Sequence, residues 1–241
     1  MDLAADIGNT KAKLRYFDNQ GSIIFSYDFP VSALNNFSFS ELPVPEKLIV
    51  SDVSGNAGQF CSFWSQQGVQ VIKMSHHLNF PVKICYKSPE TLGQDRIAAI
   101  CGAATLYEGY AIMVIDAGTA ITYDYLDENL NYLGGNISPG IDLRFKSLNQ
   151  HTSLLPLLSK EDSYKPTGTT TSEAITAGVL NGVFYEIENY IKLWSNKSER
   201  HIVIVTGGDA SFLVNSIKSS IFVNLNLVPI GLKRILDLNA E

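Results

Sequence analysis

A short cassette that joins an acidic residue to a glycine occurs twice in this chain, each time at the end of an apolar run. The first copy reads D-I-G-N-T at residues 6–10, and the second reads D-A-G-T-A at 116–120. A stretch that is typical of a strand follows each copy, at 13–17 and at 121–126. The pattern predicts a strand, a tight turn and a second strand, with a carboxylate at the mouth of the turn and a glycine inside it.

This arrangement suits a phosphate group. Glycine lets the backbone approach an anion and direct its N–H groups at it, threonine adds a hydroxyl donor, and aspartate can hold a metal ion, often through water. A single copy would more often be an ordinary hairpin, because Asp and Gly are common turn residues. Two copies in matching positions indicate instead two similar halves with a nucleotide between them.

Composition narrows the classes of protein that need to be considered. The 241 residues are 45% hydrophobic and 17% charged, as in a soluble globular protein with enough apolar material for two cores. No apolar stretch approaches the roughly 18 residues that span a bilayer, and the N-terminus lacks a basic signal segment, so we expect a cytoplasmic protein with no membrane partner. The net charge of −6, without a basic run, argues against nucleic acid as a partner. Three widely spaced cysteines indicate neither disulfides nor a zinc site.

The order of the expected elements repeats once along the chain. In the first half we expect strands at 2–7, 12–17, 22–28, 48–50, 69–74 and 82–85, helices at 56–67 and 91–107, and a loop at 29–46. In the second half we expect strands at 111–115, 119–126, 131–137, 202–205 and 221–225, helices at 139–148, 172–194 and 231–238, and a loop at 151–168. This order predicts an α/β protein of two ribonuclease-H-like domains, 1–109 and 110–241.

Six motifs follow one another in the chain and together resemble those of one enzyme family. They are D-I-G-N-T-K-A-K at 6–13, Y-K-S-P-E-T-L-G-Q-D-R at 86–96, D-A-G-T-A-I-T at 116–122, G-G-N-I-S-P-G at 134–140, T-T-S-E-A-I-T-A-G at 170–178 and V-T-G-G-D-A at 205–210. With them the chain resembles, over nearly its whole length, the type III pantothenate kinases of the actin, Hsp70 and sugar kinase (ASKHA) superfamily. The resemblance implies a nucleotide in the cleft between the two domains. It also implies that ATP phosphorylates pantothenate to 4'-phosphopantothenate, the first step of coenzyme A biosynthesis.

The resemblance assigns the two cassettes to ATP and its cations. It implies nucleotide contacts from Asp6, Ile7, Gly8, Asn9, Thr10, Lys11, Ala12, Lys13 and Thr119. Asp6 would lie near magnesium, with water between them, and Asp116 would hold a monovalent cation, K⁺ or NH₄⁺. The turn amides, the Thr10 hydroxyl and the Lys13 ammonium suit oxygens that gain charge during phosphoryl transfer. Without the resemblance, Asp116 would more often simply cap a turn, and the Gly207-Gly208 turn is as well explained as a plain strand-to-helix turn as by contact with adenosine.

The same resemblance makes Asp95 the catalytic base and implies a substrate-binding set. That set is Tyr86, Gly93, Gln94, Asp95, Arg96 and Thr171. A carboxylate in the first turn of a helix meets the positive end of the helix dipole, although Asp is also favoured there for stability alone. The planar guanidinium of Arg96 suits a substrate carboxylate, and its alternative is a solvated charge at a helix end. The Thr171 hydroxyl has an alternative as well, as a helix cap.

Two other functions remain open on the sequence. The fold could serve another small alcohol or the hydrolysis of a phosphate chain, or the chain could be a non-catalytic regulator, since some relatives of the family were first described as accessory factors for transcription. The presence of Asp6 and Asp95 favours the enzyme. The resemblance further implies a homodimer, with the pantothenate pocket at or near the subunit interface.

Overall fold

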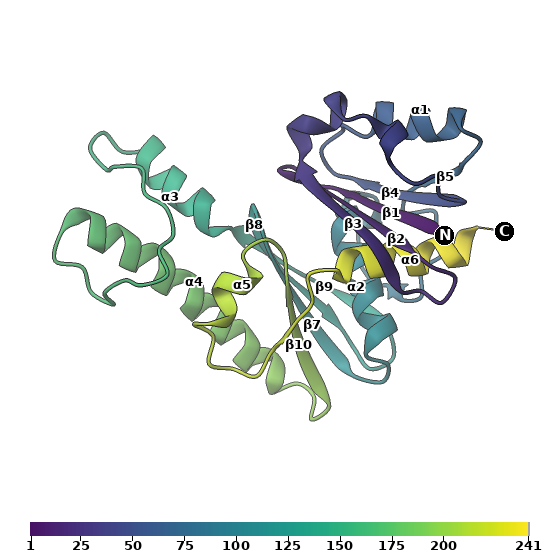
Figure 1. Cartoon of the computed structure of the whole chain (residues 1–241). Coiled ribbons are helices and arrows are strands. Elements are labelled where there is room, and N and C mark those ends of the chain that lie inside the picture. Colours follow the sequence, from purple (N-terminus) through teal and green to yellow (C-terminus); the bar gives the residue numbers. More distant parts are fainter. Residues whose placement is uncertain (241) are drawn as a thin grey trace. The chain divides into compact units, whose positions relative to one another are not determined.

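The computed structural model describes residues 1–240, and at Asn35 it describes the backbone only. The chain is an α/β protein with two mixed sheets (Figure 1). Its strands are β1 (Asp2–Ile7), β2 (Lys11–Phe17), β3 (Ile23–Pro30), β4 (Lys47–Asp52), β5 (Gln70–Lys73), β6 (Lys83–Ile84), β7 (Ala111–Ala117), β8 (Ala120–Leu126), β9 (Asn131–Pro139), β10 (His201–Thr206) and β11 (Phe222–Val223). Its α-helices are α1 (Gly58–Gln66), α2 (Gln94–Leu106), α3 (Ile141–Gln150), α4 (Thr171–Ser195), α5 (Ala210–Val214) and α6 (Leu227–Asn239). The α/β class expected from the sequence is confirmed.

The chain forms two compact units. The first comprises residues 1–109, 126–134 and 226–241, and the second comprises 110–125 and 135–225. The units share the border after Gly109 with the two predicted domains, but two later segments belong with the first unit. One of them is α6, which joins the first unit because it packs against α2, β1 and β4. The domain limits 1–109 and 110–241 stay a prediction.

The first unit is built on the five-stranded sheet, whose order is β3-β2-β1-β4-β5. β1 pairs with β2 in antiparallel fashion and with β4 in parallel, so that Asp6 lies opposite Lys13 on one side and Ser51 on the other. Alternate residues of β1 (Leu3, Ala5 and Ile7) enter a core that also contains Phe60 and Trp64 of α1. Because side chains alternate along a strand, Asp6 points to the opposite face, and α6 packs against the same strand.

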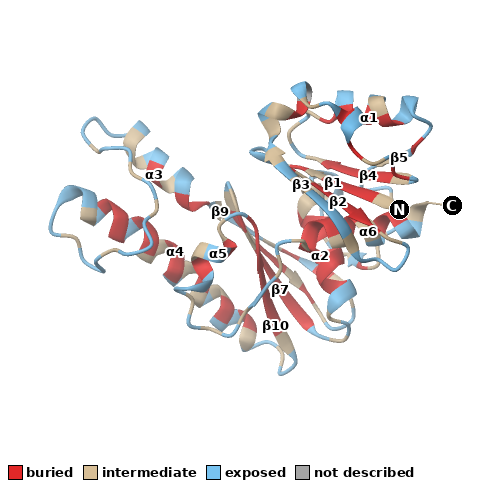
Figure 2. Cartoon of the chain, in the orientation of Figure 1, coloured by how far each residue is buried: buried red, intermediate tan, exposed pale blue. Residues whose placement is uncertain are grey.

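Two glycines allow α2 and α6 to lie very close together in the first unit. A Cβ atom at Gly231 would lie 1.8 Å from the carbonyl oxygen of Ala98, and one at Gly102 would lie 2.2 Å from that of Leu227. The buried face of each helix is visible in Figure 2. The position of α2 therefore depends on α6, a helix from the far end of the chain.

The second unit takes its core from β7, β8, β10 and the long helix α4. Leu180, Val183 and Ile187 of α4 are fully buried and pack with Met113 and Val203 of the strands. The order of the sheet is β11-β10-β7-β8-β9-β6. Strand β10 is parallel to β7, and it places Thr206 opposite Asp116. This pairing brings the turn after β10 to the end of β7.

The expected elements are present, with differences at their ends and in the loops. The predicted loop at 29–46 contains the two 3-10 helices η1 (Val31–Asn36) and η2 (Phe39–Glu41), and η3 (Pro89–Thr91) precedes α2. Helix α6 begins at Leu227 rather than at Gly231, because a proline such as Pro229 is tolerated in the first turn of a helix, where its missing N–H has no intrahelical partner. Among the described helices, none combines the length and the apolar character that crossing a bilayer requires.

Candidate active site

The first cassette forms a tight turn between β1 and β2 in the first unit. The Gly8 N–H donates to the Lys11 carbonyl oxygen at 3.0 Å, and a Cβ at Gly8 would lie only 3.2 Å from that oxygen. Asn9, Thr10 and Lys11 are exposed. The turn therefore presents polar groups to a ligand, as the sequence predicts for a phosphate site.

Not every residue of the 6–13 segment offers its side chain. Ile7 and Ala12 are fully buried in the core of the first unit, so only their main-chain atoms are left for a nucleotide. Asp6 and Lys13 are half-buried and lie opposite one another across the β1–β2 pair, on the face away from that core. The alternation of the strand thus divides the cassette into a packing half and a polar half.

The predicted base lies in the first turn of α2. Gly93 is the N-cap, and the Oδ1 atom of Asp95 accepts a hydrogen bond from the Arg96 N–H at 2.9 Å. A Cβ at Gly93 would come within 2.6 Å of the same Oδ1 atom. Asp95 is half-buried at the end of the helix where the dipole stabilises negative charge. Glycine at the cap leaves room for this carboxylate.

The start of α2 lies beside the end of β4. The Oε1 atom of Gln94 accepts a hydrogen bond from the Asp52 N–H at 3.4 Å, and the preceding residue of β4, Ser51, is the register partner of Asp6. The Ser51 hydroxyl is buried and has no hydrogen-bond partner among the described residues. The fold therefore brings Gln94 and Asp95 to the ends of β1 and β4, where Asp6 lies. Almost ninety positions separate Asp6 from these two residues in the sequence.

Tyr86 and Arg96 form the next part of the candidate substrate site. The Arg96 guanidinium carbon lies 6.0 Å from the centroid of the Tyr86 ring, which in turn stacks on Tyr132 with 6.2 Å between ring centroids. Arg96 is only 7% exposed, so its reading as a solvated helix-end charge is wrong. An arginine over an aromatic ring keeps its planar fork in one orientation. No sequence pattern indicates Tyr132, because the pairing of β6 with β9 is what brings it to Tyr86.

The second cassette forms a corresponding turn in the second unit. The Gly118 N–H donates to the Ala120 carbonyl oxygen at 3.0 Å, and Thr119 is exposed. Gly207 has φ +93°, and a Cβ there would lie 2.4 Å from Oδ1 of Asp116. The turn after β10 therefore packs directly on the cassette, and only glycine fits there. The two motifs lie almost ninety positions apart in the sequence, and the pairing of β10 with β7 is what joins them.

Two neighbours of this turn were missed on the sequence. The Asp209 N–H donates to the Ala117 carbonyl oxygen at 2.9 Å, and the Asp209 carboxylate forms an ion pair with Lys160. Lys160 lies in the predicted loop at 151–168 and is one-third exposed. A lysine in a polar loop carries no signal of its partner, so this contact is a tertiary finding.

Thr171 is the first residue of α4 and is exposed. The cap of this helix is the preceding residue: the Thr170 hydroxyl accepts from the Glu173 N–H at 3.2 Å, and the Glu173 carboxylate accepts from the Thr170 N–H at 3.2 Å. The alternative that Thr171 caps the helix is therefore wrong. Its hydroxyl is left for another role.

The donor set suits cations that are held largely by the substrate. The described residues contain no group of three or more His, Cys, Asp or Glu side chains that could hold a metal ion. Magnesium commonly uses one or two carboxylates together with substrate phosphates and water. A single carboxylate beside a phosphate turn, as at Asp6, fits that use. Asp116, beside the second turn, offers the oxygen ligand that a hard monovalent cation prefers.

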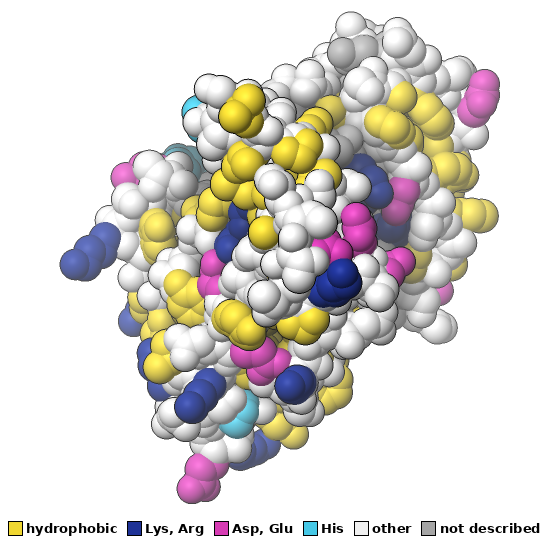
Figure 3. Space-filling view, turned by 90° about the vertical axis from the view of Figure 1, so that its left-hand side faces the viewer, with side chains coloured by type: hydrophobic (Ala, Val, Ile, Leu, Met, Phe, Trp, Pro, Cys, Tyr) yellow, Lys and Arg dark blue, Asp and Glu magenta, His cyan; other side chains and the backbone are white. Residues whose placement is uncertain are grey.

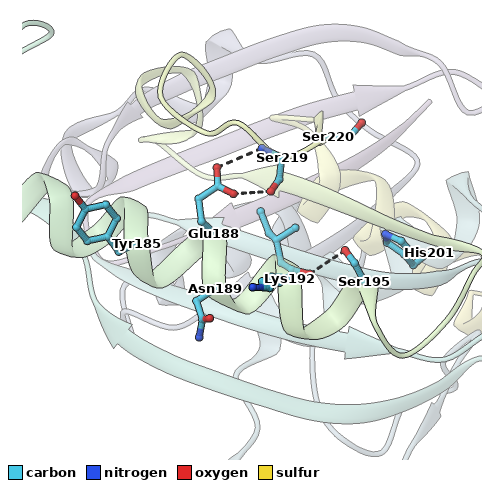
Figure 4. Close-up of a pocket in the computed structure, with 9 residues that line it drawn as sticks. Tyr185, Glu188, Asn189, Lys192, Ser195, His201, Ser219 and Ser220 are labelled. Carbon is cyan, nitrogen blue, oxygen red and sulfur yellow. Dashed lines mark hydrogen bonds between the residues drawn. The ribbon is translucent and has the colours of Figure 1, made fainter.

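A separate hollow of about 570 Å³ lies along α4 in the second unit (Figure 4). Glu188 and Lys192 of α4 line it together with Ser219 and Ser220. The Glu188 Oε2 atom accepts from the Ser219 hydroxyl at 2.5 Å, so the main acidic group in the hollow already has a partner. None of the predicted site residues lines it, and it does not belong to the candidate active site.

Comparison with solved structures identifies the fold. The fold matches a Baf family protein from Campylobacter jejuni, named as a candidate transcriptional activator, with a TM-score of 0.66 at 24% identity over 98% of this chain and 97% of that one. It also matches the activator of 2-hydroxyisocaproyl-CoA dehydratase from Clostridium difficile with bound ADPNP, with a TM-score of 0.54 at 14% identity over 98% and 95% of the two chains. These neighbours share the fold that actin, Hsp70 and the sugar kinases have, so the predicted fold of two ribonuclease-H-like domains is confirmed.

Comparison of sequences identifies the family. The family model described as type III pantothenate kinase matches residues 2–193. The type III pantothenate kinase of Flavobacterium johnsoniae is 38% identical over 232 residues, which cover 95% of this chain and 94% of that protein. The one from Bacteroides fragilis is 39% identical over 239 residues, 99% and 98% of the two chains. The chain belongs to the type III pantothenate kinase family, and it is an ATP-dependent kinase.

Proposed function

We propose that this chain transfers the γ-phosphoryl group of ATP to the hydroxyl of pantothenate, which yields 4'-phosphopantothenate in the first step of coenzyme A biosynthesis. One observation carries the proposal most directly. The first turn of α2, with Asp95, lies beside the end of β4, and β4 pairs with the strand that leads into the Gly8 phosphate turn. Phosphoryl transfer to an alcohol needs a base close to a phosphate-binding turn, and both lie at the ends of neighbouring strands here.

Asp95 has the position of a general base. As the substrate oxygen forms its bond to the γ-phosphorus, the hydroxyl proton passes to the Asp95 carboxylate, and the bond from phosphorus to the bridging oxygen breaks to release ADP. The turn amides at 9–10 and the Lys13 ammonium would stabilise charge on the phosphate oxygens. Magnesium bound near Asp6 would supply further charge neutralisation at the β- and γ-phosphates.

Arg96 and Tyr86 suit the recognition of pantothenate. The substrate carries a carboxylate, which the planar guanidinium can bind with two parallel hydrogen bonds. The Tyr86 ring, which lies beside Arg96 and stacks on Tyr132, limits the orientations of that guanidinium. We assign Gly93 and Gln94 to the same pocket as residues of the turn, and Thr171 as an exposed hydroxyl.

Three further features are part of the proposal. A monovalent cation at Asp116, K⁺ or NH₄⁺, and a homodimeric enzyme rest on the family resemblance, and a cytoplasmic location rests on the pattern of apolar and charged residues in the sequence. The face in Figure 3 shows charges of both signs interspersed, which agrees with a small-molecule partner rather than a nucleic acid. Light scattering that finds only monomers at working concentrations would rule out the dimer.

The test is a phosphorylation assay with ATP, magnesium and pantothenate, run in potassium and again in sodium. Asp95→Asn should lower kcat by about 10²-fold or more while the KM for ATP changes by less than about 3-fold, because the base acts in the transition state. Asp142→Asn is the matched control: Asp142 is also the second residue of a helix that follows a glycine cap, and it is exposed. Equal losses in the two variants would contradict the role of Asp95.

The substrate and the cation have outcomes of their own. Turnover that requires potassium would support a monovalent-cation site at Asp116, and equal turnover in sodium would contradict a potassium-specific site there. Turnover of another alcohol, with none of pantothenate, would favour a different substrate on the same fold. ATP binding without turnover of any alcohol would favour a regulator.

A further inference from the structure

Asp52, the last residue of β4, organises the loop that follows it. Its carboxylate accepts five hydrogen bonds, from the N–H groups of Ser54 (3.1 Å), Gly55 (2.8 Å), Asn56 (3.3 Å) and Ala57 (2.9 Å) and from the Ser54 hydroxyl (3.0 Å). Burial raises the pKa of this carboxyl, but the hydrogen bonds from the loop outweigh burial and hold the pKa below its usual value. The loop at 53–57 is thereby fixed around one charged group at neutral pH.

The main chain of the same segment contacts two parts of the candidate active site. The Val53 N–H donates to the Ile7 carbonyl oxygen at 3.1 Å, directly before the Gly8 turn. The Asp52 N–H donates to Oε1 of Gln94 at 3.4 Å, directly before Asp95. All of these residues lie in the first unit. The segment thus connects the phosphate turn to the first turn of α2.

We infer that Asp52 is a positioning residue for phosphoryl transfer: by holding the 53–57 loop, it fixes the first turn of α2 relative to the phosphate turn. The inference rests on the proposed function. Asp52 touches no reacting atom; it acts through Val53 and Gln94. A misplacement of about 1 Å can cost roughly 10² in rate, and phosphoryl transfer depends mainly on such positioning. No motif singled out Asp52 in the sequence.

A cavity beside the loop gives a second reason to expect an effect on the substrate. Asp52, Gly55 and Ala57 line a cavity of about 350 Å³ together with Gln94 and Lys73. Gln94 belongs to the predicted substrate-binding residues. A change in the 53–57 loop therefore also changes the lining of a cavity next to those residues. The positioning role therefore concerns both the base and the wall beside it.

Asp52→Asn is the informative substitution, because the amide replaces one acceptor oxygen with a group that cannot accept the loop N–H bonds. We expect kcat to fall about 10- to 100-fold, with the KM for ATP within about 2-fold of the wild type. The matched control is Asp18→Asn. Asp18 also accepts N–H bonds from its own turn, from Gln20 (2.9 Å) and Ser22 (2.8 Å), but at the opposite end of β2 from the phosphate turn. We expect its kcat to stay within about 2-fold.

A double-mutant cycle separates positioning from a general loss of stability. In an Asp95→Asn background the base is already absent, so adding Asp52→Asn should lower kcat by less than about 2-fold. An equal loss in both backgrounds would overturn the inference. If Asp52→Asn does not fold, Asp52→Ser, which keeps one acceptor oxygen, takes its place in the cycle.

Hydrogen exchange tests the inference independently of the substrate. The Gly8 and Ile97 N–H groups are hydrogen-bonded in the phosphate turn and at the start of α2. Both should exchange about 10-fold faster in Asp52→Asn than in Asp18→Asn. Equal exchange in the two variants would refute the role of Asp52. If the wild type does not phosphorylate pantothenate, the proposed function fails, and this measurement still decides the role of Asp52.

Discussion

Replacing Gly231 by alanine should destabilise the first unit by about 3 kcal/mol. The added Cβ would lie 1.8 Å from the Ala98 carbonyl oxygen, and real Cβ contacts are essentially never under 3.0 Å, so α6 and α2 must separate locally by roughly 1.2 Å. Overpacking of this kind costs about 1–3 kcal/mol and occasionally more. The neighbouring atom belongs to the backbone and cannot rotate away, so we expect a packing cost above the upper end of that range. The higher helix propensity of alanine offsets about 1 kcal/mol of this cost, which leaves the net loss given above.

The matched control is Gly178→Ala in the interior of α4. Nothing lies within 4 Å of a Cβ at that position, and the residue is exposed. Only the helix propensity then changes, so we expect stabilisation by about 0.5–1 kcal/mol. The assay is urea unfolding followed by circular dichroism, with the two variants compared to the wild type. An unfolding free energy for Gly231→Ala within about 0.5 kcal/mol of the wild type would refute the close helix contact.

Two further predictions concern the second unit. Thr170→Ala removes the side-chain cap of α4 and should destabilise the protein by about 1 kcal/mol in urea unfolding, whereas Thr171→Ala should have little effect on stability; equal effects would contradict the observed cap. Glu186 accepts hydrogen bonds from Tyr123 (2.7 Å) and Arg144 (2.6 Å). Burial raises its pKa, but these hydrogen bonds and the one from Ser138 outweigh burial and hold the pKa below its usual value. A depressed pKa stabilises the folded state above the unfolded-state pKa of about 4.3, and this contribution is lost as the pH falls through the folded-state pKa. The unfolding free energy of the wild type should therefore fall more steeply below about pH 4.3 than that of Glu186→Gln, and parallel curves would contradict this assignment.

The order of strands and helices followed largely from local pattern. Alternating or continuous apolar runs predicted the strands, and the 3.6-residue spacing of apolar side chains predicted α1 and α2. Backbone chemistry was local as well: glycine between an acidic and a hydroxyl residue predicted the turns at Gly8 and Gly118, and both form. One error in the prediction was local as well: the helix was expected to begin at Gly231, after Pro229, but α6 begins at Leu227.

The candidate site was predicted residue by residue, but its assembly was not. The sequence places Asp95 in the first turn of a helix, because first-turn preferences depend on neighbouring residues. It does not place that turn against the end of β4, which depends on the packing of α6 and on a hydrogen bond from Asp52 to Gln94. The burial of Arg96 depends in the same way on Tyr86.

The sequence by itself determined the family, the α/β class and the chemical types in each cassette, because motifs, periodicity and turn residues act over a few positions. Only the tertiary structure decided which cassette residues face a ligand, how Gly207 covers Asp116, and which segment connects the phosphate turn to Asp95. Parallel strand pairing and helix crossing join residues that are far apart in the chain, and they arise from burial of whole faces. Such contacts leave no local pattern in the sequence.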